Sequence, residues 1–360
     1  MEDIYVCSTY FHVLITLIKV MKCKNNSSIV ITSTIDNPKD IIRRLKLSKL
    51  FSNIYFYDEL EVRKIFKEKN IERKIFRKNE MIDLFNKNSN INFFEFDNIY
   101  IYNDWTTIGA YLIDSKLKYH LIEDGIDAFY YIKGNFKDRI TFLNPNLNYK
   151  IKAIIKKIFN IGYDFFGQSK YVIDIEVNDK NKIFIKNKNI IEVRKEFLYN
   201  SLTEEEKMKI YNIFISNNIQ VSSKDKSILL LTQPLYIDKM VDTNDDQIDI
   251  YIEIINKYIK NYKIYIKPHP RDIMDYKKIN KDVIIIDKKL PIEILKFNKN
   301  INFEKAITIT SSSVFKRTFN ISRFAEKLLP EPGVPRIKPF IFLLIFRLNN
   351  KRFRETEFKP

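Results

Sequence analysis

The alternation of short apolar runs with amphipathic helical patterns constrains the fold of this chain most strongly. Residues 4–7 predict a buried strand, and residues 10–22 carry apolar side chains at the i, i+3, i+4, i+7 spacing of one helix face. Strand-like runs recur at 29–32, 54–57, 99–102 and 119–122, with helical patterns between them that include 38–48 and 105–115. This order is typical of a parallel, doubly wound α/β sheet.

The same alternation returns after a less regular stretch, which includes a basic helix expected near 147–160. A Thr-x-x-Glu capping box at Thr203 and Glu206 predicts a helix to about residue 216, followed by a polar segment. Strands are then expected at 228–231, 263–266, 283–286 and 306–309, and helices at 246–260 and 291–297. We therefore predict two Rossmann-like parallel-sheet domains, at 1–217 and 226–318, facing a central cleft.

Composition changes abruptly near residue 319. Ile, Lys and Asn dominate up to about residue 315, whereas Arg and Pro become frequent afterwards. The hydrophobic run 340–346 is flanked by Lys338 and Arg347, which is typical of a segment that lies on a membrane surface. A changed reading frame or a replaced gene end explains the same break, so residues 319–360 are treated as an atypical basic-aromatic tail.

The net charge of +17 over 360 residues raises the alternative of a non-catalytic module that binds nucleic acid or a membrane. The lysines are scattered among acidic residues, however, and no zinc-finger, RRM or KH motif occurs, so we expect no nucleic-acid partner. Two cysteines, Cys7 and Cys23, provide no disulfide framework. Neither the N-terminal apolar stretch nor residues 340–346 predicts a signal peptide or a membrane span, which favours the cytoplasm.

Ligands of open α/β sheets bind outside the carboxyl ends of the strands, and polar clusters follow five predicted strands. The clusters are Ser8 with Thr9, residues 123–125, Thr232 with Gln233, residues 267–271 and residues 310–313. In the second cluster, Glu123 and Asp124 point to opposite faces of an extended chain, so only one enters a cleft. Such a carboxylate suits a general base, although a solvated acidic turn has the same sequence.

His269 lies between two prolines, which fix its ring direction, and between the cations Lys267 and Arg271. Neighbouring cations make a histidine resist protonation until an anion arrives, which is typical of a phosphate site. The hydroxyls of Ser311, Ser312 and Ser313 stand where a following helix would begin, a position that suits either an anion or an ordinary cap. His12 and His120 sit in apolar periodic runs and are expected to be packing residues.

Phosphate-loop and metal motifs are absent from the sequence: it has no GxGxxG, GxxxxGK[ST], HExxH or CxxC. A phosphate-bearing donor would therefore be held by His, Ser and basic residues without a metal. Glu293, in a Leu-Pro-Ile-Glu segment, could accept hydrogen bonds from ribose hydroxyls or simply favour a helix N-terminus.

With these motifs in order, the chain resembles the bacterial lipooligosaccharide sialyltransferases of glycosyltransferase family 52. The resemblance covers residues 1–315 and rests on Glu-Asp-Gly at 123–125, His-Pro at 269–270, the serines at 311–313 and the segment around Glu293. It implies a GT-B type fold, CMP-activated sialic acid as donor, a galactose-ended lipooligosaccharide or capsule glycan as acceptor, inversion and no metal or other cofactor. It also implies a bacterial enzyme of the cytoplasm. The charge and the type of acceptor favour peripheral contact with the inner face of the cytoplasmic membrane, and a homodimer is an alternative to a monomer.

Carried over residue by residue, the resemblance makes Asp124 the base that deprotonates the acceptor and His269 the group that protonates the leaving phosphate. Glu293 would hold the ribose, and the serines would hold the phosphate. The full set of expected donor-binding residues is Thr9, Gln233, Lys267, Pro270, Arg271, Glu293, Ser311, Ser312 and Ser313.

Two departures from the family's pattern keep alternatives open. Some members carry the base just past a proline in the second domain, where this chain has Leu235, so Asp238 is the alternative base. The tail also lacks the family's C-terminal helices. A transferase of the same fold that uses another nucleotide sugar, such as a glucosyltransferase, is the nearest other function.

Overall fold

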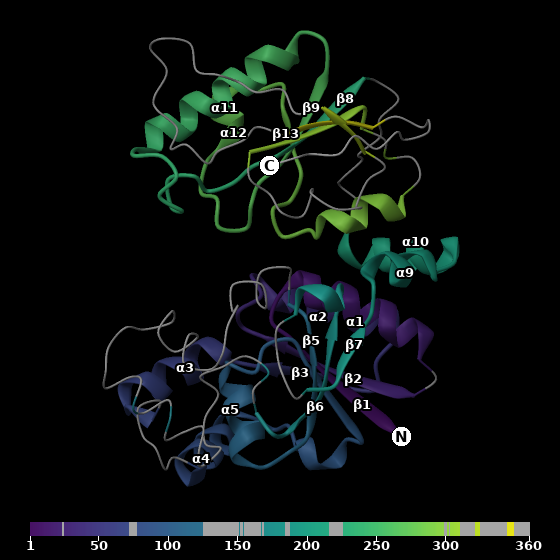
Figure 1. The fold of residues 1–360 in the computed structure, drawn as a ribbon, viewed down its shortest axis with the longest axis vertical. Helices are drawn as coiled ribbons and strands as arrows, with labels where there is room; N and C mark the ends of the chain where they lie inside the picture. Colours follow the sequence, from purple (N-terminus) through teal and green to yellow (C-terminus); the bar gives the residue numbers. More distant parts are fainter. Residues whose placement is uncertain are drawn as a thin grey trace. The chain divides into compact units, whose positions relative to one another are not determined.

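The computed structural model describes residues 1–23, 25–71, 78–124, 151, 154, 167, 169–183, 188–215, 226–298, 301 and 303–309, and the backbone of 321–324 and 344–348. Contacts divide the chain into two units, Met1–Phe214 and Ile215–Pro360, and each contains its own sheet (Figure 1). The helix expected near 147–160 falls almost entirely outside the described residues.

The first unit is built on a 7-stranded parallel sheet in the order β3-β2-β1-β4-β5-β6-β7. Its strands are β1 (Glu2–Cys7), β2 (Asn26–Thr32), β3 (Ile54–Tyr57), β4 (Asn98–Ile101), β5 (Tyr119–Ile122), β6 (Val172–Val177) and β7 (Ile190–Glu192). The first five lie where the apolar runs predict them. The sequence pattern did not predict β6, because Asp174 and Glu176 interrupt its apolar run. In the structure these two carboxylates pair with His120 and Lys19.

Helices cover both faces of this sheet: α1, α2 and α10 pack together on one face, and α3, α4 and α5 pack together on the other (Figure 1). Their bounds are α1 (Tyr10–Lys22), α2 (Pro38–Ser48), α3 (Glu59–Glu68), α4 (Lys78–Asn88), α5 (Thr107–Asp114), α9 (Lys195–Asn200) and α10 (Glu204–Phe214). The capping box that begins α10 is confirmed, since Glu206 N–H donates to Thr203 Oγ1 and Thr203 N–H donates to Glu206 Oε2.

Gly109 in α5 leaves no room for a side chain. A Cβ there would lie 2.3 Å from the Asp104 carbonyl oxygen, and Asp104 is held in place by Gly167 N–H at 2.9 Å and Tyr119 Oη at 3.1 Å. We therefore expect Gly109→Ala to lower the free energy of unfolding by about 3 kcal/mol or more. Urea unfolding measures this, and an unchanged midpoint would show that the Asp104 loop moves freely.

The second unit has a 6-stranded sheet in the order β10-β9-β8-β11-β13-β12. The predicted strands β8 (Ser227–Leu231), β9 (Lys263–Lys267), β10 (Ile284–Ile285) and β11 (Lys305–Thr308) are parallel to one another. The tail adds β12 (Ile321–Phe324) and β13 (Leu344–Leu348) as antiparallel strands, which the sequence pattern did not predict. Both halves of the chain thus contain Rossmann-like sheets.

Three helical segments lie among the described residues of the second unit. Helix α11 (Asn244–Ile259) begins with a reciprocal capping box between Thr243 and Asp246, and its buried face includes Ile250, Ile254 and Ile255. The helix expected at 291–297 is the 3-10 helix η4 (Ile292–Phe297), and α12 (Tyr276–Ile279) is a single turn.

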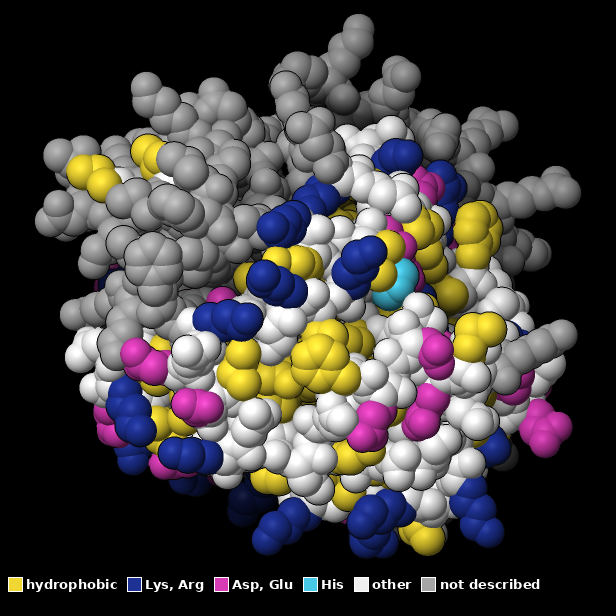
Figure 2. Space-filling view, turned by 90° about the horizontal axis from the view of Figure 1, so that it is seen from below, with side chains coloured by type: hydrophobic (Ala, Val, Ile, Leu, Met, Phe, Trp, Pro, Cys, Tyr) yellow, Lys and Arg dark blue, Asp and Glu magenta, His cyan; other side chains and the backbone are white. Residues whose placement is uncertain are grey.

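Among the described residues, no helix combines the length and apolar character needed to cross a bilayer. Lys and Arg side chains are distributed over the face shown in Figure 2, with Asp and Glu among them. This distribution on that face agrees with the scattered lysines of the sequence.

Candidate functional site

The carboxylate of Asp124 meets the ring of His12 at the carboxyl end of the first sheet. Asp124 follows β5, and His12 lies in the first turn of α1, just after β1. His12 Nε2 is hydrogen-bonded to Asp124 Oδ1, and His12 Nδ1 accepts a hydrogen bond from Ser8 N–H at 3.1 Å. Because Nδ1 accepts, we assign the proton of the neutral ring to Nε2, where it is donated to Asp124.

The His12 ring is held rigidly. It is fully buried and stacks on Tyr102, with ring centroids 4.1 Å apart and planes inclined by 5°. The Thr9 side chain accepts a hydrogen bond from His12 N–H at 3.1 Å and so caps α1. His12 is therefore a packing residue, as expected, but it also orients the carboxylate of Asp124, which the sequence did not predict.

Asp124 has the character of an ionised base at a partly open position. Its side chain is 25% exposed. Burial by itself raises the pKa of Asp124, but the interactions with His12, Asn103 and Lys195 outweigh it and hold the pKa below the ordinary value. The carboxylate is thus charged near neutral pH and partly exposed.

Glu123 turns the other way, in agreement with the alternation expected of an extended chain. Its side chain is buried, and Oε2 accepts a hydrogen bond from Asn178 N–H at 2.6 Å. Lys195 Nζ lies 3.9 Å from Glu123 Oε1, beyond hydrogen-bond distance, and over the Phe11 ring. Lys195, at the start of α9, therefore places a positive charge near the carboxylates of both Glu123 and Asp124.

His269 is presented on the loop after β9 in the second unit. Its Nδ1 accepts a hydrogen bond from Arg271 N–H at 3.2 Å, so the neutral ring carries its proton on Nε2. No described residue is hydrogen-bonded to Nε2. Burial, followed by the charges of Arg271 and Lys267, lowers the pKa of His269, as the flanking cations predicted.

A buried hydrogen-bond network anchors this loop from below. His269 N–H donates to Thr232 Oγ1 at 3.3 Å, and that hydroxyl donates to Asp272 Oδ2 at 2.6 Å. Tyr276 Oη donates to the same carboxylate oxygen at 2.5 Å. Asp272 therefore ties the ends of β8 and β9 together and fixes the backbone that carries His269.

Lys267 is turned inside the loop. Its ammonium donates to the carbonyl oxygens of Pro268 at 3.0 Å and Lys288 at 2.8 Å. Burial lowers the pKa of Lys267 to about 8, although the charges of Glu293 and Asp287 oppose the shift. Lys267 thus stabilises the loop. Because its ammonium is buried, it can act on a bound ligand only by electrostatic attraction through the surrounding protein.

This lowered pKa predicts a pH dependence of stability. Between pH 8 and 10.5 the unfolded chain keeps the Lys267 proton while the folded chain releases it. The folded state is therefore favoured increasingly as pH rises, by up to about 3 kcal/mol. We expect the unfolding free energy of wild type minus that of Lys267→Met to increase from pH 7.5 to 9.5 in urea titrations; a constant difference would contradict the burial of the charge.

Asp238, the alternative base, is paired with Arg271. The guanidinium donates to both carboxylate oxygens, at 2.8 and 3.2 Å. Leu235, at the position where some family members carry an acid, is fully buried. Arg271 thus engages one lone pair on each oxygen of the Asp238 carboxylate.

The other predicted donor-binding residues have varied surroundings. Gln233 is half-buried, and its backbone exchanges hydrogen bonds with Tyr251 Oη. Glu293 is in η4, where its charge acts on Lys267, and Pro270 is exposed. Gly125 and the serines at 311–313 lie outside the described residues.

Sequence reasoning missed His12, Asp272, Tyr276 and Lys195 as parts of the two strand-end clusters, whereas Thr232 belongs to one of the predicted clusters. A signal existed for His12, because it stands within five residues of a predicted strand end. Asp272 and Lys195 gave no signal, since only the folded chain brings Asp272 beneath Thr232, 40 residues away in sequence.

Comparisons with known proteins give one family and several distant relatives. The model of glycosyltransferase family 52 matches residues 63–321. An uncharacterized protein of Haemophilus influenzae is 29% identical over 225 residues, which span 61% of this chain and 67% of that protein. Two solved structures of UDP-GlcNAc 2-epimerase of Methanocaldococcus jannaschii, the second in complex with UDP-GlcNAc and UDP, are 16% identical to this chain. Their TM-scores are 0.40 and 0.41, over 86% of this chain and 79% of the epimerase chain.

The family match spans both units and includes the motifs at 123–125, 269–271 and 311–313. The two Rossmann-like sheets of the chain are those of the GT-B type. The chain therefore belongs to glycosyltransferase family 52, and its activity class is glycosyl transfer.

Proposed function

We propose that this protein is an inverting, metal-independent sialyltransferase. It moves sialic acid from CMP-sialic acid to a galactose-ended lipooligosaccharide or capsule glycan. The unit Met1–Phe214 serves the acceptor, and the unit Ile215–Pro360 binds the nucleotide sugar. The observation that carries the proposal is the His269 loop, where an Nε2 with no bonded partner among the described residues stands beside Arg271 and a buried ammonium.

In the proposed reaction, Asp124 takes the proton of an acceptor hydroxyl, whose oxygen bonds to the anomeric carbon of sialic acid. The bond from that carbon to the CMP phosphate oxygen breaks, and the phosphate leaves with the electron pair. His269 donates a hydrogen bond or its proton to this oxygen as negative charge builds there. Ser311, Ser312 and Ser313 hold the phosphate, and Glu293 holds the ribose.

The pKa directions support these opposite roles. The lowered pKa of Asp124 keeps it ionised and able to accept a proton. The lowered pKa of His269 keeps it neutral until the anionic donor binds, because the phosphate then stabilises the protonated ring. Binding of the donor thus favours the protonated His269 that then assists departure of the phosphate.

The test is CMP release from CMP-sialic acid by the purified full chain, in EDTA, with and without a lactose-ended acceptor. We expect release that depends on the acceptor and is unaffected by EDTA. Thermal stabilisation by CMP without turnover would support the nucleotide assignment and reject the acceptor. Neither turnover nor stabilisation would overturn the donor, and glucose-carrying nucleotides would then be tested as substrates of the alternative transferase.

A further inference from the structure

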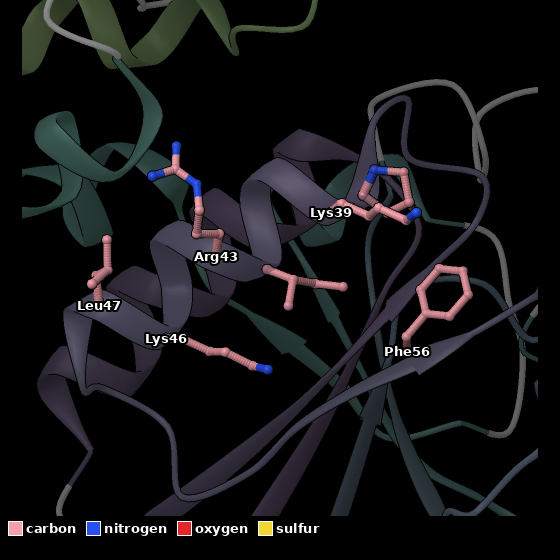
Figure 3. A pocket seen from close by; sticks show the side chains of 7 residues that line it. Lys39, Arg43, Lys46, Leu47 and Phe56 are labelled. Atoms are coloured by element: carbon pink, nitrogen blue, oxygen red, sulfur yellow. The ribbon is translucent and has the colours of Figure 1, made fainter.

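A groove of about 510 Å³ runs between helix α2 and strand β3, at the edge of the first sheet (Figure 3). It is lined by Pro38, Lys39, Ile42, Arg43, Lys46, Leu47 and Phe56. Among the α2 residues, Lys39, Arg43, Lys46 and Leu47 form the stripe opposite Ile41 and Leu45, which are buried against the sheet. This stripe is therefore the outward face of an amphipathic helix.

The groove exposes large apolar side chains that are not buried in the protein core. Leu47 is 72% exposed and Phe56 is 46% exposed. Phe56 stands on β3, which is an edge strand of the sheet. Exposed apolar groups gathered in one hollow indicate a surface that docks an apolar partner.

The charge of the groove is of one sign. Its lining contains three cations and no acidic residue. Arg43 is bridged to Asp40 at 3.0 Å, whereas no carboxylate of a described residue pairs with Lys39 or Lys46. Figure 3 shows Lys39 and Lys46 extending from α2 toward the side on which Phe56 stands. Cations beside exposed apolar side chains complement a surface that is anionic outside and apolar beneath.

The groove begins close to the residues that hold His12. Tyr10 Oη donates to Asp36 O at 2.9 Å, and Thr34 Oγ1 donates to Ser8 O at 2.8 Å, so the loop leading into Pro38 is bound to the start of α1. A lipid carrier seated along α2 would therefore have its glycan near the strand end where Asp124 lies.

We infer that the α2–β3 groove docks the protein onto an anionic phospholipid surface. Lys39, Arg43 and Lys46 meet the phosphate headgroups, while Leu47 and Phe56 enter the boundary with the acyl chains. The inference rests on the proposed function only in that docking would present a lipid-linked acceptor to the first unit.

The test is sedimentation of the full chain with vesicles of phosphatidylcholine alone or of equal parts phosphatidylcholine and phosphatidylglycerol. We expect binding to the anionic vesicles only, weakened by salt. Lys39→Gln with Lys46→Gln lowers the partition coefficient by about tenfold or more. Leu47→Ser with Phe56→Ser also lowers it but leaves the salt dependence unchanged. The matched control, Lys67→Gln with Lys87→Gln, removes the same charge from exposed positions on α3 and α4 and binds as wild type.

Several results would overturn the inference. Equal losses in both lysine pairs would show that net charge alone attracts the vesicles. Full competition by soluble glycerol phosphate would assign the groove to a free phosphate compound. A wild-type mass of two chains that falls to one in Leu47→Ser with Phe56→Ser, without vesicle binding, would assign it to a second copy of this chain.

Turnover with a soluble lactose-ended acceptor separates this inference from the proposed function. The groove variants are expected to keep that turnover, because none of the changed side chains contacts His12 or Asp124. If wild type releases no CMP but still binds anionic vesicles through the groove, the proposed donor fails and the docking surface stands.

Discussion

Asp124→Asn is expected to lower acceptor-dependent CMP release by about 10²–10⁴-fold. Asparagine keeps an oxygen that accepts the His12 Nε2 proton, so the local hydrogen bond and the fold persist. What it loses is the negative charge and the basicity needed to take a proton from the acceptor. The measurement is the turnover number at saturating donor, with CMP binding followed separately by calorimetry and expected to stay unchanged.

Two matched variants control this result. Glu123→Gln retains the hydrogen bond from Asn178 N–H and changes an adjacent buried carboxylate, so turnover should fall by less than about fivefold. Asp238→Asn releases Arg271 and tests the alternative base. Loss of turnover in Asp238→Asn with normal turnover in Asp124→Asn would move the base to the second unit.

The role of His12 beside Asp124 is separable from its packing. His12→Phe keeps an aromatic ring on Tyr102 but removes the hydrogen bond to the carboxylate. Since His12 helps to lower the pKa of Asp124, its loss raises that pKa. The base must be ionised, so the acidic limb of the kcat/KM profile is expected to move to higher pH. A purely structural His12 would lower activity equally at every pH.

His269→Ala carries the second largest expected effect, a loss of about 10²–10³-fold in turnover. The variant removes an imidazole whose Nε2 has no bonded partner among the described residues. Thr232, Asp272 and Tyr276 remain to hold the backbone of the loop. Because the effect falls on the departing phosphate, a donor with a better leaving group should recover part of the loss. An equal loss with every donor would contradict the proton-donor role.

A titration of His269 by NMR gives a readout that packing alone does not move. In the free protein its pKa lies below the ordinary value, because burial, Arg271 and Lys267 disfavour the cation. Bound CMP brings negative charge, so the pKa is expected to rise above the ordinary value. The matched variant Arg271→Met should raise the pKa of free His269, and an unchanged pKa on adding CMP would contradict phosphate contact.

The sequence located most of the regular structure because those segments carry strong local patterns. The strands at 54–57 and 119–122 and the helices at 10–22 and 38–48 have the predicted bounds. Strand β6 was missed because Asp174 and Glu176 break its apolar run, and their burial is tolerated only through partners on β5 and α1. The two tail strands were missed because residues 321–324 and 344–348 pair with each other across a long separation.

By itself, the sequence determined the two α/β halves, the polar strand ends and the low proton affinity of His269. These follow from side-chain periodicity and from cations next to the histidine, which act over a few residues. Tertiary structure alone decided that His12 orients Asp124, 112 residues away, and that Asp272 anchors the His269 loop. Hydrogen bonds need atoms within about 3 Å of each other, and only the completed sheet brings such distant residues together.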